Sequence, residues 1–207
     1  MDLYIIGAGD VGGFMAYHAN QMGSYNIQGF LDDNSEKHGQ ELYGAKVIGG
    51  ISTLGKINNK VAVVIAIANP ASKKKVYEKI RGIPNIVFPN FIHPSSWIGE
   101  KVVLGEGCII YPNVSINFEA ILNNFVIINM NAAIGHNCQF GDFSTVSPSV
   151  SCGGFTKLGS QSFLGIGAST LQSTTIGNKS TIGAGAVIIK DIPDNVTVVG
   201  NPGKIIK

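Results

Sequence analysis

Residues 158–188 read LGSQSFLGIGASTLQSTTIGNKSTIGAGAVI, and a large apolar side chain returns at every sixth position, interrupted only at Thr170. The same six-residue step extends backward to Ile98 without an insertion, which gives 16 positions in phase. Positions four residues further along hold small or β-branched side chains. A period of six is typical of a parallel β-helix, in which each unit supplies a short strand and a corner. Three units then make one triangular coil of 18 residues, and residues 98–188 predict five coils.

The coil length also predicts which residues lie above one another, because positions 18 apart share a column. One such column contains Phe118, His136, Gly154 and Gln172. A second column contains Pro148, Ile166 and Ala184. The chain has three cysteines, Cys108, Cys138 and Cys152, and all of them fall on inward positions. An odd number without zinc-type spacing favours core packing over a disulfide framework or a metal site.

Residues before the repeat follow an α/β pattern. Apolar runs at 3–6 and 61–68 are typical of buried parallel strands, and helices are expected over 10–22 and 70–82. Gly7, Gly9 and Gly12 form a GxGxxG motif, which by itself indicates NAD or merely a tight structural turn. The segment is too short for a complete dinucleotide-binding domain and corresponds to one mononucleotide-binding half. We therefore predict a Rossmann-like half domain over residues 1–92 and a β-helix with a C-terminal tail over residues 93–207.

Composition excludes several classes of protein. Charged residues make up 14% of the chain and the formal net charge is +2, which argues against a nucleic-acid partner. The 44% of hydrophobic residues argues against disorder. No apolar run has the length of a membrane span, and the opening MDLYIIGAGD lacks the basic start of a secretory signal. A cytoplasmic protein without membrane insertion is therefore expected.

Several segments together carry a family resemblance. They are YIIGAGDVGG at 4–13, GFLDD at 29–33, FIHPSSWIG at 91–99, IGHNCQFGDF at 134–143 and DIPDNVTVVGNPGKIIK at 191–207. The chain resembles bacterial nucleotide-aminosugar N-acetyltransferases of the UDP-N-acetylbacillosamine N-acetyltransferase and sialic-acid O-acetyltransferase-like type. The resemblance implies a left-handed β-helix and a homotrimer with sites between adjacent prisms. It also implies acetyl transfer from acetyl-CoA to a UDP- or dTDP-linked 4-amino-4,6-dideoxyhexose for surface glycans.

The resemblance assigns the catalytic residues. His136 aligns with the general base of the family, a role that suits an imidazole near neutral pH. Gly154 aligns with a glycine whose N–H stabilises the developing oxyanion. Asn137 stands where relatives carry an acidic residue, and this departure leaves the strength of the base open. Asp142 is the nearest other carboxylate in the sequence, but the six-residue step places it at an adjacent corner.

The binding residues come from the same resemblance. For acetyl-CoA they are Thr145, which replaces a histidine of relatives, Ile166 and Ala184. For the nucleotide sugar they are Gly9, Asp10, Val11, Asp32, Asp33 and Ala68. No metal is expected. The alternatives are an acetyltransferase for a sugar hydroxyl or a small amine, a non-catalytic nucleotide-binding scaffold, which Asn137 and Thr145 favour, and an NAD-dependent dehydrogenase.

Overall fold

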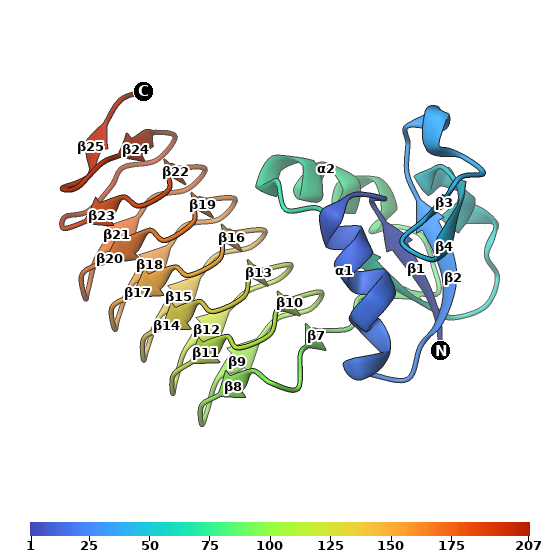
Figure 1. The fold of residues 1–207 in the computed structure, drawn as a ribbon, viewed down its shortest axis with the longest axis horizontal. Helices are drawn as coiled ribbons and strands as arrows, with labels where there is room; N and C mark the ends of the chain where they lie inside the picture. Colours follow the sequence, from blue (N-terminus) through green and yellow to red (C-terminus); the bar gives the residue numbers. More distant parts are fainter. The chain divides into compact units, whose positions relative to one another are not determined.

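The computed structural model describes residues 1–207 and divides the chain into two compact units, Met1–Phe91 and Ile92–Lys207. Figure 1 labels the helices and strands of both units. None of the helices has the length and apolar character needed to cross a membrane.

The N-terminal unit is built on a six-stranded sheet with the order β3-β4-β2-β1-β5-β6. Its strands are β1 (Asp2–Ile6), β2 (Asn26–Leu31), β3 (Glu41–Leu42), β4 (Ala45–Gly49), β5 (Val61–Ile65) and β6 (Ile86–Val87). Its helices are α1 (Asp10–His18), α2 (Pro70–Ile80) and the 3₁₀ turns η1 (Ala19–Gln21), η2 (Ser35–Lys37) and η3 (Ile51–Lys56). All pairings are parallel except the β3–β4 hairpin.

Local sequence explains these elements. Every residue of β5, VAVVI, is buried, as expected for a central parallel strand that is covered on both faces. Helix α2 starts where Asn69 accepts a hydrogen bond from the Ser72 N–H at 2.9 Å and Pro70 occupies the first turn. The helix expected over 10–22 is regular only to His18 and then tightens into η1.

The second unit is a left-handed parallel β-helix, as predicted. Its short strands stack in three columns (Figure 1). The first column contains β7 (Phe91–Ile92), β10 (Ile109–Ile110), β13 (Ile127–Ile128), β16 (Thr145–Val146), β19 (Phe163–Leu164), β22 (Thr181–Ile182), β24 (Thr197–Val199) and β25 (Lys204–Ile205). The second contains β8 (Trp97–Ile98), β11 (Ser115–Ile116), β14 (Ala133–Ile134), β17 (Ser151–Cys152), β20 (Ser169–Thr170) and β23 (Val187–Ile188). The third contains β9 (Val103–Leu104), β12 (Ile121–Leu122), β15 (Gln139–Phe140), β18 (Lys157–Leu158) and β21 (Thr175–Ile176).

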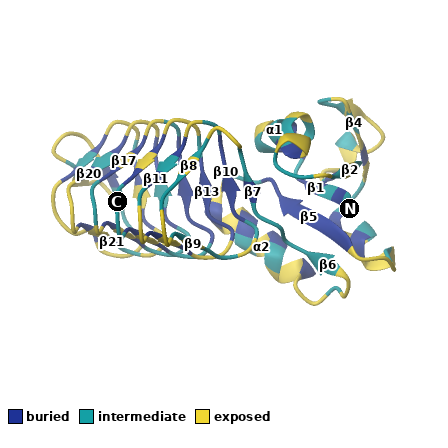
Figure 2. Cartoon of the chain, turned by 90° about the horizontal axis from the view of Figure 1, so that it is seen from below, coloured by how far each residue is buried: buried dark blue, intermediate teal, exposed yellow.

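The strand register confirms the coil length of 18 residues. Ile116 pairs with Ile134, and Ile134 pairs with Cys152 on the next coil. The large side chains of the repeat fill the interior, and only Ile98 and Leu104 on the first coil are not fully buried. Figure 2 shows buried residues along the strands and exposed residues at the corners.

The three cysteines are part of this core, as predicted. Cys108, Cys138 and Cys152 are buried free thiols. Burial raises the pKa of Cys138 to about 11 and raises the pKa of Cys152 further. Cys138 and Cys152 are therefore protonated, and all three buried thiols serve as small core side chains.

At one corner the second turn residue of successive coils adopts the left-handed conformation. The φ angles are 58° at Glu119, 57° at Asn137 and 61° at Phe155. Asn is one of the few residues besides Gly that tolerates this region well. Because the three residues repeat the same backbone geometry one coil apart, their side chains leave the prism at neighbouring levels of one corner.

Candidate active site

His136 lies on this corner, in the turn that follows β14, and its side chain is half-buried between two aromatic rings. The ring of Phe118, one coil earlier, stacks on the imidazole with centroids 5.1 Å apart and planes 11° apart. The ring of Phe155 meets it edge-on, with centroids 5.0 Å apart and an interplanar angle of 86°. Both phenylalanines are substantially exposed, at 44% and 50%. The imidazole therefore points out of the prism core but is held in a fixed orientation.

The two ring nitrogens of His136 have different environments. Nδ1 lies 2.9 Å from Oδ1 of Asn137, the next residue in the chain. Nε2 faces Gly154, because a Cβ added to that glycine would stand 2.7 Å from Nε2 and 2.8 Å from Cε1. Any side chain at position 154 would collide with the imidazole. The imidazole of His136, one coil earlier, can therefore keep this position only if residue 154 is glycine.

The backbone of Gly154 contributes a free donor beside Nε2. Its carbonyl accepts a hydrogen bond from the Ser173 N–H at 2.8 Å, whereas its own N–H has no acceptor within the chain. A ring nitrogen that can accept a proton and a free N–H donor therefore occupy successive coils of one column. This is the pair of groups that acyl transfer requires at the reacting carbonyl.

Asp142 does not contact His136. Its Oδ1 accepts hydrogen bonds from the backbone N–H and the Nδ2 of Asn124, at 2.9 and 3.1 Å. At this adjacent corner Ser160 N–H donates to Asn178 Oδ1, and Asn178 N–H donates to Asp194 Oδ1. The carboxylate of Asp142 is part of a structural ladder between coils.

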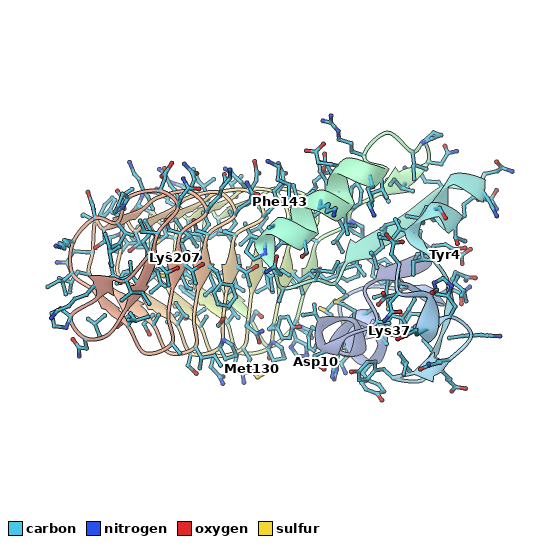
Figure 3. The ribbon with its side chains drawn as sticks, turned by 90° about the horizontal axis from the view of Figure 1, so that it is seen from above. Tyr4, Asp10, Lys37, Met130, Phe143 and Lys207 are labelled. Carbon is cyan, nitrogen blue, oxygen red and sulfur yellow. The ribbon has the colours of Figure 1, made fainter.

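The residues expected at acetyl-CoA have different environments. Ile166, 60% exposed, and the exposed Ala184 occupy a different corner from His136. Met130 belongs to this second column, and Figure 3 shows it at an edge of the prism. Thr145 on β16 is only 2% exposed, so it offers no open contact surface in this chain.

A groove of about 410 Å³ runs along the face formed by β8, β11, β14, β17 and β20. Its lining includes Gly135 and Gly153, the residues directly before His136 and Gly154. Ligand-sized space therefore adjoins the corner that carries the imidazole.

The glycine-rich turn of the N-terminal unit is tightly packed. Gly7 has a φ angle of 100°, and a Cβ on Gly12 would overlap the Gly7 carbonyl oxygen. Gly9 caps α1 with an extended backbone, and Asp10 and Val11 begin the helix. Both Gly7 and Gly12 are therefore required for the close approach of helix and strand.

Asp32, which follows β2, is tied to this turn. Its Oδ2 accepts hydrogen bonds from the Ala8 N–H and from Lys37 Nζ, both at 3.0 Å, and Oδ1 accepts from the Asn34 N–H at 3.0 Å. Burial alone raises the pKa of Asp32, but the three hydrogen bonds outweigh it and hold the pKa below its ordinary value. Lys37 Nζ also donates to the Ala8 carbonyl at 3.1 Å. A lysine and a carboxylate together thus fix the loop.

The neighbouring Asp33 is more exposed. Its carboxylate binds Lys79 Nζ at 2.8 Å and the Ile51 N–H at 3.0 Å, and the Lys79 hydrogen bond is the main cause of its lowered pKa. A cavity of about 240 Å³ at the carboxyl ends of β1 and β2 is lined by Gly7, Asp32, Asp33 and others. Ala68 follows β5 but does not line this cavity.

Lys37 and Glu119 are among the residues of these sites that the sequence did not predict. Glu119 Oε2 accepts a hydrogen bond from Asn137 Nδ2 at 2.9 Å. The 18-residue step would have revealed it, because Glu119 stands directly below Asn137 in the column. Lys37 had no comparable signal, since its position depends on the η2 turn.

Known proteins resemble this chain along its whole length. The family described as PglD N-terminal domain matches residues 2–80. The acetyltransferase domain of PglB from Neisseria gonorrhoeae, in complex with acetyl coenzyme A, is 30% identical with a TM-score of 0.90, covering 99% of this chain and 98% of that one. PerB from Caulobacter crescentus, in complex with CoA and GDP-perosamine, is 28% identical with a TM-score of 0.92, covering 100% and 98%. WeeI from Acinetobacter baumannii is 25% identical with a TM-score of 0.89, covering 100% of both chains. No curated protein sequence matches.

The fold of this chain and its solved relatives together place it among the hexapeptide-repeat acyltransferases. The PglB match, at 30% identity over 99% of this chain, also shows the family within that class. The chain belongs to the family of hexapeptide-repeat sugar N-acetyltransferases that includes the PglB acetyltransferase domain and PerB.

Proposed function

We propose that the protein transfers the acetyl group of acetyl-CoA to the amino group of a 4-amino-4,6-dideoxyhexose carried by a nucleoside diphosphate, a building block for surface glycans. The observation that carries this proposal is the placement of His136 Nε2 against Gly154, whose N–H has no acceptor within the chain. The complexes of PerB with CoA and GDP-perosamine and of the PglB domain with acetyl-CoA support the two substrates.

Acetyl-CoA supplies an activated acetyl thioester. In the proposed reaction the sugar amine attacks the thioester carbon while His136 Nε2 removes its proton. A C–N bond forms, the C–S bond breaks, and the proton passes from the imidazole to the departing sulfur. The Gly154 N–H donates to the carbonyl oxygen as negative charge develops on it. Asn137 holds the imidazole from its other side.

For acetyl-CoA we propose contacts with Ile166 and Ala184 of a neighbouring subunit in a homotrimer. These residues lie on a different corner from His136, so one prism does not present both to the same ligand. The exposure of Ile166 at 60% and of Phe155 at 50% supports contact between corners of adjacent prisms. Thr145 is only 2% exposed, so in this proposal it makes no direct contact with acetyl-CoA.

For the nucleotide sugar we propose the turn of Gly9, Asp10 and Val11 together with Asp33 and Ala68. Backbone N–H groups at the start of α1 and the ammonium of Lys37 suit an anionic diphosphate. Asp32 fixes the turn, since both of its oxygens already accept hydrogen bonds. These hydrogen bonds also disfavour an NAD site, because there the carboxylate must accept hydrogen bonds from the ribose hydroxyls.

The test replaces His136 by Ala and measures thiol release from acetyl-CoA with a panel of nucleotide-linked amino sugars. Turnover should fall by roughly 10²–10⁴ while CoA affinity stays unchanged. Matched acceptors with a hydroxyl in place of the amine serve as the control and should not react. Undiminished turnover in the variant excludes His136 as the base. Tight nucleotide-sugar binding without any thiol release by the wild-type chain would instead favour a binding scaffold.

A further inference from the structure

The hydrogen bonds around His136 continue beyond Asn137 to a carboxylate. Asn137 Oδ1 lies 2.9 Å from His136 Nδ1, and Asn137 Nδ2 lies 2.9 Å from Glu119 Oε2. Glu119 and Asn137 occupy the same left-handed corner position on successive coils, at φ angles of 58° and 57°. The coil repeat therefore brings a carboxylate within one amide group of the imidazole.

The donors and acceptors in this chain have only one consistent arrangement. An ionised carboxylate can only accept, so Asn137 must present its NH₂ group to Glu119. The amide oxygen then faces His136, and because that oxygen also only accepts, Nδ1 must carry the proton. In the neutral imidazole, Nε2 is then left with its lone pair on the side of Gly154.

Glu119 is ionised under ordinary conditions. The hydrogen bond from Asn137 is the largest cause that lowers the pKa of Glu119, followed by the charge of Lys101. Lys101 Nζ lies 3.6 Å from Oε1 of the same carboxylate. Lys101 and His136 are the titratable groups that act on Glu119, and both favour its charged form.

We propose that Glu119 is a positioning residue for catalysis, which sets the Nδ1–H form of His136 through the amide of Asn137. The proposal rests on the proposed function, in which His136 Nε2 is the base. The amide of Asn137 transmits the orientation, and the carboxylate of Glu119 determines which way the amide faces. When Nε2 takes the substrate proton, the negative charge of Glu119 also stabilises the resulting imidazolium.

The first test substitutes Glu119→Gln. A glutamine can donate or accept, so Asn137 is free to turn and Nδ1 loses its fixed partner. We expect kcat to fall about tenfold, with the KM for acetyl-CoA unchanged. The free enzyme gives a second readout, because ¹⁵N NMR of the imidazole distinguishes the two tautomers. The chain has only 4 histidines, which makes the signal of His136 assignable by its loss in His136→Ala. The Nδ1–H signature should be present in the wild type and lost in Glu119→Gln.

The second test is a rescue. Asn137→Asp in the Glu119→Gln background places a carboxylate directly on Nδ1 and makes the amide relay unnecessary. This double variant should recover most of the lost kcat and the Nδ1–H signature. Glu106→Gln, an exposed carboxylate at an adjacent corner, is the matched control and should keep wild-type kcat.

The outcomes separate this proposal from the function on which it rests. If His136→Ala is inactive but Glu119→Gln keeps both wild-type kcat and the tautomer signature, the proposal is wrong while the base assignment survives. A loss in Glu119→Gln that Asn137→Asp does not restore also overturns it, because the loss then has a structural cause. If His136→Ala retains full turnover, the base assignment itself fails, whereas the tautomer measurement still reports on the hydrogen-bond chain.

Discussion

The ring of Phe118 lies flat against the imidazole of His136, with 5.1 Å between centroids and 11° between planes. The two residues are one coil apart and occupy the same turn position, so the repeat itself creates the stack. The ring of Phe118 is 44% exposed and lies outside the core of the prism. Its position restricts the rotation of the imidazole that we propose as the base.

Replacement of Phe118 by Ala should therefore reduce kcat without unfolding the protein. An aromatic pair of this kind contributes about 0.5–1.5 kcal/mol, which corresponds to a fall in kcat of roughly 2- to 13-fold. Steady-state kinetics with saturating acetyl-CoA measures the effect. Phe118→Tyr keeps the stacked ring and should stay near the wild-type rate. An equal loss in both variants would show that stacking is not the cause.

Gly154→Ala should abolish activity but leave the fold intact. The added Cβ would stand 2.7 Å from Nε2 of His136, so the imidazole must leave its position. The φ angle of Gly154 is not among the left-handed values, so alanine fits the backbone. Thermal unfolding of the variant should match the wild type while thiol release falls by about 10² or more. An active Gly154→Ala enzyme would show that the base does not need this orientation.

Asp32→Asn should destabilise the protein in a manner that depends on pH. Because the pKa of Asp32 is held below its ordinary value in the folded state, its ionised form stabilises the fold. That contribution is present above the ordinary aspartate pKa of about 3.9 and is lost as the pH falls through the lower folded value. Urea unfolding at pH 7 should show a loss of about 1–3 kcal/mol, which shrinks toward pH 3. Asp33→Asn, whose side chain is 50% exposed against 17% for Asp32, should have a smaller effect. A difference that does not change with pH would contradict this account.

The three cysteines should not react with thiol reagents in the native protein. With a pKa of about 11, Cys138 would be only about 0.1% thiolate at pH 8 even if it were accessible. A colorimetric disulfide reagent should therefore detect no thiol before denaturation and all three after it. Rapid labelling of any cysteine in the folded protein would show that the coils open locally.

The β-helix was predictable because large apolar side chains recur at every sixth position of the sequence. Each inward position recurs without an insertion from Ile98 to Ile188, so counting alone gave the coil length, the columns and the inward cysteines. The hand of the helix needed the family resemblance, since a period of six does not determine it. The end of α1 was less predictable, because the change to a 3₁₀ turn after His18 depends on the surrounding packing.

The candidate site was predicted only in part. His136 and Gly154 were placed beside each other by the coil step, and the structure agrees with that placement. The absence of an acid at position 137 left the strength of the base open, and Asp142 was the only carboxylate considered near it. The carboxylate of Glu119 comes from the coil below. Lys37 depends on the local course of a short turn, which no periodic pattern describes.

The left-handed corner shared by Glu119, Asn137 and Phe155 has a consequence for how relatives should be compared. In a solenoid, side chains from more than one coil can reach the same point on the surface. A charge missing at one alignment column can be supplied from 18 residues away and still act at nearly the same point in space. Loss of an acidic residue in an alignment of such proteins is therefore poor evidence of lost activity. The positions one coil before and one coil after it must first be checked for a replacement carboxylate.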